Sequence, residues 1–133
     1  QIRTHQLDEA DAQISCCNML AESLIKGDQV TVEGFIHNGQ VTVIGVVDSV
    51  MYPGTQSFKQ FDYPSKAPAS VQQRMTDLAA MVAKGAGLDN TMFNIEMSYD
   101  KETDRLEVIE LNSRMSSSIL RVSTTVPGVP KLV

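Results

Sequence analysis

One stretch, residues 91–114, constrains the fold of this chain more than any other. Within it, residues 92–98 alternate between apolar and polar side chains, which is the pattern of a β-strand with one buried face. Residues 106–112 form a second run that is rich in β-formers, and the charged run 100–105 between them is typical of a turn. The pattern therefore predicts an antiparallel hairpin with one face against a core.

The polar face of this hairpin concentrates oxygen-bearing side chains. The first strand contributes Asn94 and Glu96, and the second contributes Glu110 and Asn112 at alternate positions. Hard cations such as Mg²⁺ take carboxylate and amide oxygens as ligands, usually shared with phosphate and water. Arg114 follows the second strand, where its guanidinium could bind a phosphate or a carboxylate. The alternative on the pattern alone is a solvent face with scattered acids.

The strongest helix pattern covers residues 70–84. Its apolar stripe has helical spacing and consists of Val71, Met75, Leu78, Ala79 and Val82. Ser70 and Gln73 form a candidate capping box, and Gly85 is a natural C-cap. We expect this stripe to cover the apolar face of the hairpin, made by Phe93, Ile95, Ile109 and Leu111. A shorter helix pattern covers residues 8–17, with acids in its first turn.

Two further β-rich runs, residues 29–36 and 40–48, are joined at Asn38-Gly39, which is a strong hairpin signal. Because the second run is apolar on both faces, we expect it to be a central strand. Residues 49–68 carry several prolines and predict a long connection. The predicted fold class is α+β, an antiparallel β-sheet with helices packed on one face.

Length and composition exclude several classes of function. The chain has 133 residues and a formal net charge of −5, which suits one small domain and argues against a nucleic-acid partner. No apolar run approaches the ~20 residues of a membrane span, and there is no signal-peptide pattern. Cys16 and Cys17 are adjacent and are the only cysteines, so we expect reduced thiols, a cytoplasmic location and no zinc site.

The hairpin residues resemble the magnesium-binding hairpin of the ATP-grasp superfamily, which includes biotin carboxylase and the large subunit of carbamoyl phosphate synthetase. The similarity rests on Phe93-Asn94-Ile95-Glu96 and on Val108-Ile109-Glu110-Leu111-Asn112-Ser113-Arg114, with Ser113 in place of a frequent Pro. The resemblance implies one or two Mg²⁺ ions, with Mn²⁺ as a substitute, on Glu96, Glu110 and Asn112, and a catalytic role for Arg114. A longer turn leaves Glu96 or Asn94 as the partner of Glu110, and we favour Glu96.

A second block, residues 21–32, is similar to the family segment that contacts adenine and ribose. Glu22 matches the Glu that opens this segment, and Ser23 and Ile25 match the positions whose carbonyl and amide face adenine. Gln29 stands at the ribose position, where the family usually has Glu, and its amide donates as well as accepts. The pattern alone predicts only an extended segment over residues 19–25 and a turn.

Lys59 lies in the 49–68 connection, at roughly the place where biotin carboxylase carries an active-site lysine. The alternative is an ordinary solvated loop lysine.

The resemblance covers residues 8–114. We therefore divide the chain into residues 1–115, part of an ATP-grasp C-terminal subdomain, and residues 116–133, a tail of unassigned structure. Because no N-terminal lobe with its phosphate-binding lysine fits upstream, we expect a fragment of a longer parent, inactive alone. The half-open cleft also predicts self-association as a homo-oligomer.

The resemblance implies the ATP- and magnesium-binding part of a ligase that activates a small-molecule carboxylate as an acyl phosphate, which an amine or another nucleophile then attacks. The alternative is a non-catalytic α+β binding or interaction module that keeps only the fold.

Overall fold

The computed structural model describes residues 23–55 and 57–116. The elements in chain order are β1 (Asp28–His37), β2 (Gln40–Met51), β3 (Phe58–Asp62), α2 (Ala69–Gly85), β4 (Thr91–Asp100) and β5 (Arg105–Asn112). The predicted helix over residues 8–17, the adjacent Cys16 and Cys17, and the tail from residue 117 onward lie outside the described residues.

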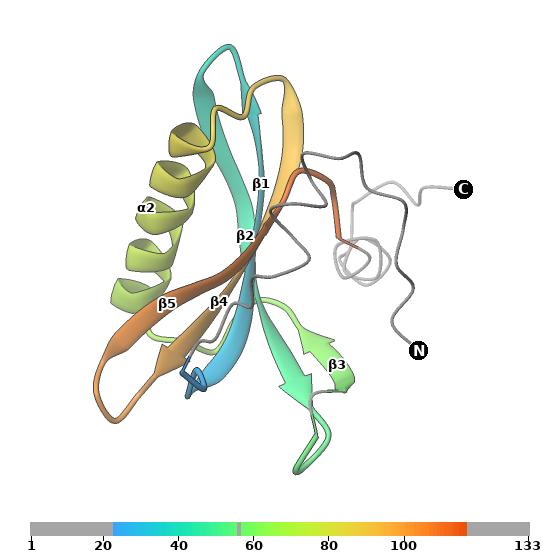
Figure 1. Cartoon of the computed structure of the whole chain (residues 1–133), viewed down its shortest axis with the longest axis vertical. Coiled ribbons are helices and arrows are strands. Elements are labelled where there is room, and N and C mark those ends of the chain that lie inside the picture. Colours follow the sequence, from blue (N-terminus) through green and yellow to red (C-terminus); the bar gives the residue numbers. More distant parts are fainter. Residues whose placement is uncertain (1–22, 56, 117–133) are drawn as a thin grey trace, which may run out of the picture.

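The five strands form one antiparallel sheet in the order β3-β2-β1-β4-β5. Helix α2 lies along one face of this sheet and contacts β1, β2, β4 and β5 (Figure 1). The predicted α+β class, an antiparallel sheet with helical cover on one face, is confirmed, and α2 is the one helix among the described residues.

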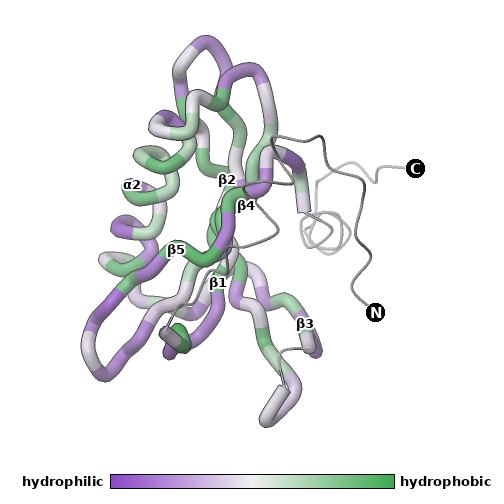
Figure 2. Tube along the Cα trace, viewed as in Figure 1, coloured by the Kyte–Doolittle hydropathy of each residue, from purple (hydrophilic) through white to green (hydrophobic). Residues whose placement is uncertain are grey.

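The core lies between α2 and the sheet. The helix contributes Val71, Met75, Ala79 and Ala83, and the facing strands contribute Val30, Val32, Val46, Phe93, Ile95, Met97 and Tyr99. Hydrophobic stretches accordingly run along the strands, whereas the β4–β5 turn is hydrophilic (Figure 2). Because side chains alternate along a strand, the same pairing that buries Phe93, Ile95 and Met97 turns the intervening residues of β4 to the other face.

The central strand is β1, and the expectation that residues 40–48 would be central is wrong. Strand β1 pairs along its length with β2 on one side and β4 on the other. Strand β3 pairs with β2 only from Asp48 onward, so the first half of β2 has one neighbour and Ile44 is 46% exposed. Strand β3 itself lies inside the predicted 49–68 connection, whose prolines indicated only loop.

Helix α2 covers the predicted residues, but its two ends are capped differently from the prediction. Its N-cap is Pro68 with no side-chain cap hydrogen bond, so the predicted Ser70–Gln73 capping box is wrong. Gln72 instead donates to the backbone oxygens of Ser65 and Ala67, at 3.1 and 2.8 Å. At the other end the helix includes Gly85, and the C-cap is Ala86.

The β4–β5 hairpin forms as predicted, with one irregularity. Glu96 pairs with Glu110 and Met97 with Val108, so Ile109 is the surplus residue of a β-bulge. Ile109 is 42% exposed, whereas Leu106 and Leu111 both pack against the core. The expectation that Ile109 and Leu111 share the buried face is therefore wrong, because the bulge shifts the alternation by one residue.

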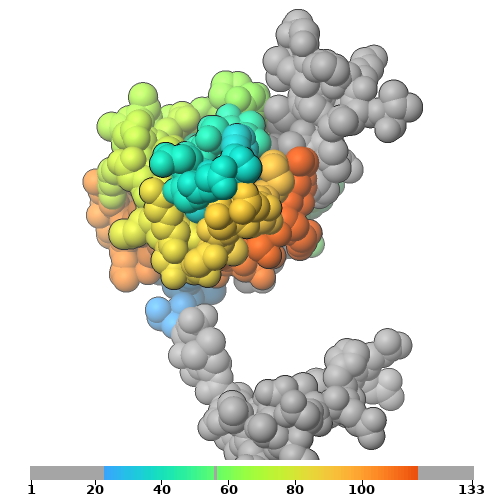
Figure 3. Space-filling model, turned by 90° about the horizontal axis from the view of Figure 1, so that it is seen from above, coloured from blue at the N-terminus to red at the C-terminus, as the bar shows by residue number. Residues whose placement is uncertain are grey.

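One end of the molecule is closed by a contact between two turns. Seen from above, the β1–β2 turn packs beside the connection from α2 to β4 (Figure 3). The Gly39 amide donates to Asp89 Oδ1 across this contact, at 3.1 Å. In the described part of the chain, no helix combines the length and the apolar character needed to cross a membrane.

We predict that Gly34→Ala destabilises the fold by about 1–3 kcal/mol, the usual cost of an overpacked core. A Cβ at Gly34 would lie 2.6 Å from both Phe93 Cζ and the Thr42 carbonyl oxygen. Gly85→Ala is the matched control, because a Cβ there meets nothing within 4 Å and alanine favours helix. Thermal unfolding monitored by circular dichroism should separate the two variants, and equal melting temperatures would contradict the close packing at Gly34.

Candidate functional site

The sheet face opposite α2 carries a continuous set of polar side chains, which we call the polar face. It comprises Gln29, Thr31 and Glu33 on β1, Asn94, Glu96 and Ser98 on β4, and Glu110 and Asn112 on β5. All three strands are held in this register by backbone pairing. Gln29 and Glu96, which are 67 residues apart in sequence, therefore stand on neighbouring strands.

Two carboxylates face each other at the centre of the polar face. Glu96 and Glu110 are direct cross-strand partners, as predicted, rather than Asn94 and Glu110. Burial raises the pKa of Glu96, the like charge of Glu110 raises it further, and the Gln29 amide and the Arg114 guanidinium act in the opposite direction. The pair thus carries repulsion that a bound cation would relieve.

Two amides flank this pair. Asn112 Nδ2 donates to Asn94 Oδ1 at 3.2 Å and to Glu110 Oε2 at 3.1 Å. Asn94 in turn donates to the backbone oxygen of Arg114 at 3.2 Å. These contacts fix the chain at the end of β5, so that Arg114 stands near Glu96 with an exposed side chain.

Gln29 joins β1 to the acidic pair. Its Nε2 donates to Glu96 Oε2 at 2.7 Å, the short distance expected of a bond to a charged acceptor. The family resemblance assigns Gln29 to a ribose position and Glu96 to a metal position. The structure brings these two residues into direct contact.

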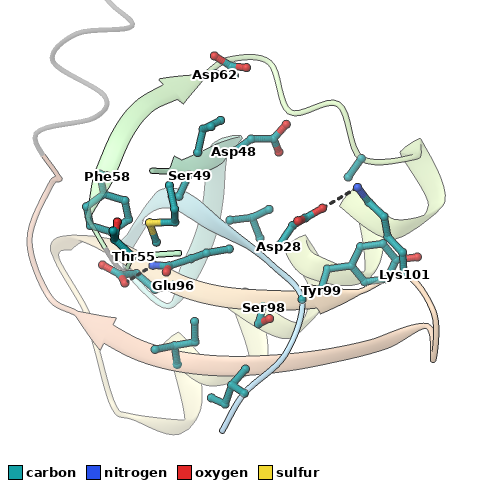
Figure 4. Close-up of a pocket in the computed structure, with 18 of the residues that line it drawn as sticks. Asp28, Asp48, Ser49, Thr55, Phe58, Asp62, Glu96, Ser98, Tyr99 and Lys101 are labelled. Carbon is teal, nitrogen blue, oxygen red and sulfur yellow. Dashed lines mark hydrogen bonds and ion pairs between the residues drawn. The ribbon is translucent and has the colours of Figure 1, made fainter. Parts of the chain in front are cut away.

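A cavity of about 1080 Å³ opens beside Glu96. Four predicted residues line it, namely Ser23, Ile25, Gln29 and Glu96, together with Met51 to Thr55, Phe58, Ile109 and the lower ends of β1 and β4. Figure 4 shows Glu96, Thr55 and Phe58 grouped at one end and the Asp28–Lys101 pair with Tyr99 at the other. One end of the cavity therefore combines the Glu96 carboxylate with the Phe58 ring, and the other end carries the Asp28–Lys101 ion pair.

The segment before β1 forms one wall of this cavity. Ser98 Oγ donates to the Lys26 carbonyl oxygen at 2.8 Å, which ties the segment to β4. Gly27 has a φ of +119°, and a Cβ there would lie 2.5 Å from the Tyr99 carbonyl oxygen, so the site requires glycine. Ser23 and Ile25 are thereby held at the cavity, whereas Glu22 lies outside the described residues.

Lys59 does not join the other predicted residues. It lies on the edge strand β3, where it is exposed, and it is not among the residues that line the cavity. Its neighbour Phe58 lines the cavity instead. A catalytic role for Lys59 stays a prediction without support from its position.

Sequence reasoning missed several residues of the site. Lys101 Nζ pairs with Asp28 Oδ2 at 2.6 Å across the charged end of the cavity, and Lys66 pairs with Asp62 at the same distance. Glu33 is fully buried on the central strand and accepts a hydrogen bond from Ser116. An acid between Val32 and the Gly-Phe-Ile run of the same strand was the available signal for Glu33, and no local pattern indicates the two ion pairs.

The donor set suits a hard cation completed by other ligands. Residues 23–55 and 57–116 contain no group of three His, Cys, Asp or Glu side chains arranged to hold a metal. They offer two opposed carboxylates and one amide, all oxygen ligands, beside a cavity. Magnesium commonly binds through one or two carboxylates and takes its remaining ligands from phosphates and water. The residues present therefore fit this ion.

Comparison with known proteins identifies relatives of this arrangement. A family profile described as the ATP-grasp domain matches residues 1–121. The C-terminal section of the carbamoyl phosphate synthase large chain from Methanopyrus kandleri is 30% identical over 94 residues, which cover 69% of this chain and 17% of that protein.

Two solved structures share the fold at low sequence identity. Biotin carboxylase from Campylobacter jejuni superposes with a TM-score of 0.62 at 21% identity, over 72% of this chain and 22% of that one. The L-amino acid ligase from Bacillus licheniformis superposes with a TM-score of 0.64 at 18% identity, over 71% and 24%. The chain thus spans about a quarter or less of each of these relatives.

We predict that Glu96→Gln raises the melting temperature at pH 7. The raised pKa of Glu96 means that its contribution to stability is present at acid pH and is lost as the pH rises through the folded-state pKa. Glutamine removes that charge and can still accept the Gln29 hydrogen bond. Because the side chain is partly exposed, we expect less than about 1 kcal/mol.

This advantage should shrink when the pH is lowered to 4, because the wild-type Glu96 loses its charge as the pH falls through its raised pKa. Glu102→Gln, in the exposed β4–β5 turn, is the control for loss of one negative charge. A wild-type chain at least as stable as Glu96→Gln at pH 7 would contradict the repulsion between Glu96 and Glu110.

Proposed function

Because this chain belongs to the ATP-grasp domain family, we propose that it is the ATP- and magnesium-binding part of a ligase. The proposed reaction activates a carboxylate as an acyl phosphate, which an amine or another nucleophile then attacks. The single observation that carries this proposal is the opposed pair Glu96 and Glu110, of which Glu96 lines a cavity together with Ser23, Ile25 and Gln29.

Glu96, Glu110 and Asn112 would hold the magnesium. Their side chains supply oxygen ligands, and the pKa of Glu96 is raised first by burial and then by the like charge of Glu110. When bound, the ion would offset the charge of the phosphates while the terminal phosphoryl group is transferred. Asn94 would hold Asn112 in place through its 3.2 Å contact.

The nucleotide would bind along the cavity wall formed by the segment before β1. Backbone groups of Ser23 and Ile25 are available to the edge of a base, because both residues line the cavity and the segment is fixed by Ser98. Glu22 would open this segment. The similar biotin carboxylase from Campylobacter jejuni was solved as a β-γ-ATP complex, which supports a nucleotide in this fold.

Arg114 would stabilise the negative charge that develops on the phosphoryl group during its transfer. An oxygen of the substrate carboxylate attacks the terminal phosphorus, the bond to the ADP oxygen breaks, and negative charge develops on the transferred group. A guanidinium beside the acidic pair can bind that charge with two hydrogen bonds. The acceptor is set by parts of the protein beyond this sheet, since sites rather than folds determine substrates.

We predict that calorimetric titration detects magnesium-dependent binding of ATP to this chain. Glu110→Gln should weaken that binding at least tenfold, because one of the two carboxylates that attract the cation is lost. Glu102→Gln should bind like the wild-type chain, since its side chain lies in the exposed turn.

Each result of the titration has a separate meaning. Binding that is equal in wild type and Glu110→Gln would remove Glu110 from the site. A wild-type chain that binds no magnesium-ATP would favour the alternative, a non-catalytic α+β module that keeps the architecture without the nucleotide site.

We also predict that the chain self-associates. The cavity exposes five large apolar side chains, Leu24, Ile25, Tyr52, Phe58 and Ile109, which a second lobe of the proposed enzyme would cover. When the 133-residue chain is studied alone, a second copy would bury these side chains. Light scattering over a concentration series should show a rising mass, and a constant monomer mass would contradict this expectation.

A further inference from the structure

Gln29 occupies an unusual position between the two ends of the site. It lies on the central strand, lines the cavity and donates Nε2 to Glu96 Oε2 at 2.7 Å. Backbone pairing already joins β1 to β4 from Asp28 to Ile36. The side-chain bond is therefore not needed to connect the strands, and its effect falls on the Glu96 carboxylate.

Among the described side chains, none forms an ion pair with either member of the acidic pair, and Arg114 acts on Glu96 only through its charge. The ion pairs recorded in residues 23–55 and 57–116 join Lys66 to Asp62, Arg74 to Asp104, Lys101 to Asp28 and Arg105 to Glu107. None of them includes Glu96 or Glu110. Within these residues, Gln29 is the donor that contacts Glu96, and Asn112 is the donor that contacts Glu110.

A neutral amide has a specific advantage at this position. It fixes one oxygen of Glu96 by a hydrogen bond but leaves the full negative charge of the carboxylate in place. A lysine or arginine would hold Glu96 more strongly and would cancel the charge that a dication needs. A glutamate at residue 29 could not donate and would add a third negative charge next to Glu96.

We propose that Gln29 is a positioning residue for the cation site, which orients the Glu96 carboxylate toward Glu110 without neutralising it. This inference rests on the proposed function, because it takes the acidic pair to be a divalent-cation site. Residues that orient a metal ligand through a hydrogen bond commonly change metal affinity by 10–100-fold when they are replaced. Gln29 therefore determines cation affinity although it is not itself counted among the ligands.

The test is a Mn²⁺ titration of the full 133-residue chain, followed by electron paramagnetic resonance of the free ion. Gln29→Met keeps the length of the side chain and removes the donor. Gln29→Lys keeps a donor and adds a positive charge. Gln73→Met is the matched control, because Gln73 donates to Asp77 at 2.9 Å on the exposed side of α2, away from the cavity.

We expect Gln29→Met to bind Mn²⁺ about tenfold more weakly than the wild-type chain, and Gln73→Met to bind as the wild type does. Gln29→Lys should lose more affinity than Gln29→Met, because its charge repels the cation. Its melting temperature should nevertheless rise, because the ammonium pairs with Glu96. If Gln29 had a purely structural role, the melting temperature and the Mn²⁺ affinity would change in the same direction in Gln29→Met and in Gln29→Lys.

Three results would overturn the inference. Unchanged Mn²⁺ affinity in Gln29→Met, with binding lost in Glu110→Gln, would leave the proposed metal site intact and remove Gln29 from it. A Gln29→Lys chain that binds Mn²⁺ as tightly as the wild type would refute the requirement for a neutral donor. A wild-type chain without Mn²⁺ affinity would remove both the proposed metal site and the role of Gln29.

Discussion

The backbone pairing of β1 with β4 is the constraint on which the site depends. It sets Gln29 and Glu96, which are 67 residues apart in sequence, at hydrogen-bonding distance on one face of the sheet. The same pairing buries Val32 against Ile95 on the opposite face. The hydrophobic core and the polar site are therefore two sides of one register, and a slip by a single residue would exchange them.

The acidic pair shows a cost that this register imposes. A partly buried carboxylate next to a second one is unfavourable for folding, which is why the pKa of Glu96 is raised. The fold tolerates this because the central strands contribute a core whose largest members are fully buried. Strained or repulsive groups of this kind are common at binding sites, where a ligand relieves them. Stability and cation binding thus place opposite demands on the same two side chains.

Local patterns predicted the hairpin and helix α2, because periodicity and turn chemistry are properties of short segments, whereas the choice of Glu96 as the partner of Glu110 came from the family resemblance. They failed where pairing is long-range. The central place of β1 and the existence of β3 depend on which strands meet, and no local signal in residues 40–68 carries that information. The contact of Gln29 with Glu96 was missed for the same reason. The bulge at Ile109 was not predicted, because an unbroken alternation of buried and exposed side chains was expected along β5.

Because of the bulge, the face on which each β5 side chain lies depends on the number of residues in the strand rather than on the identity of the bulged residue. Leu106 and Leu111 both reach the core although four residues, an even number, separate them, and only the surplus residue makes this compatible with Glu110 facing Glu96. Replacing the Ile109 side chain leaves that count unchanged. Removing or adding one residue within 110–112 would turn Asn112 from the polar face to the core. Among homologous chains, we therefore expect a constant residue count from Ile109 to Arg114.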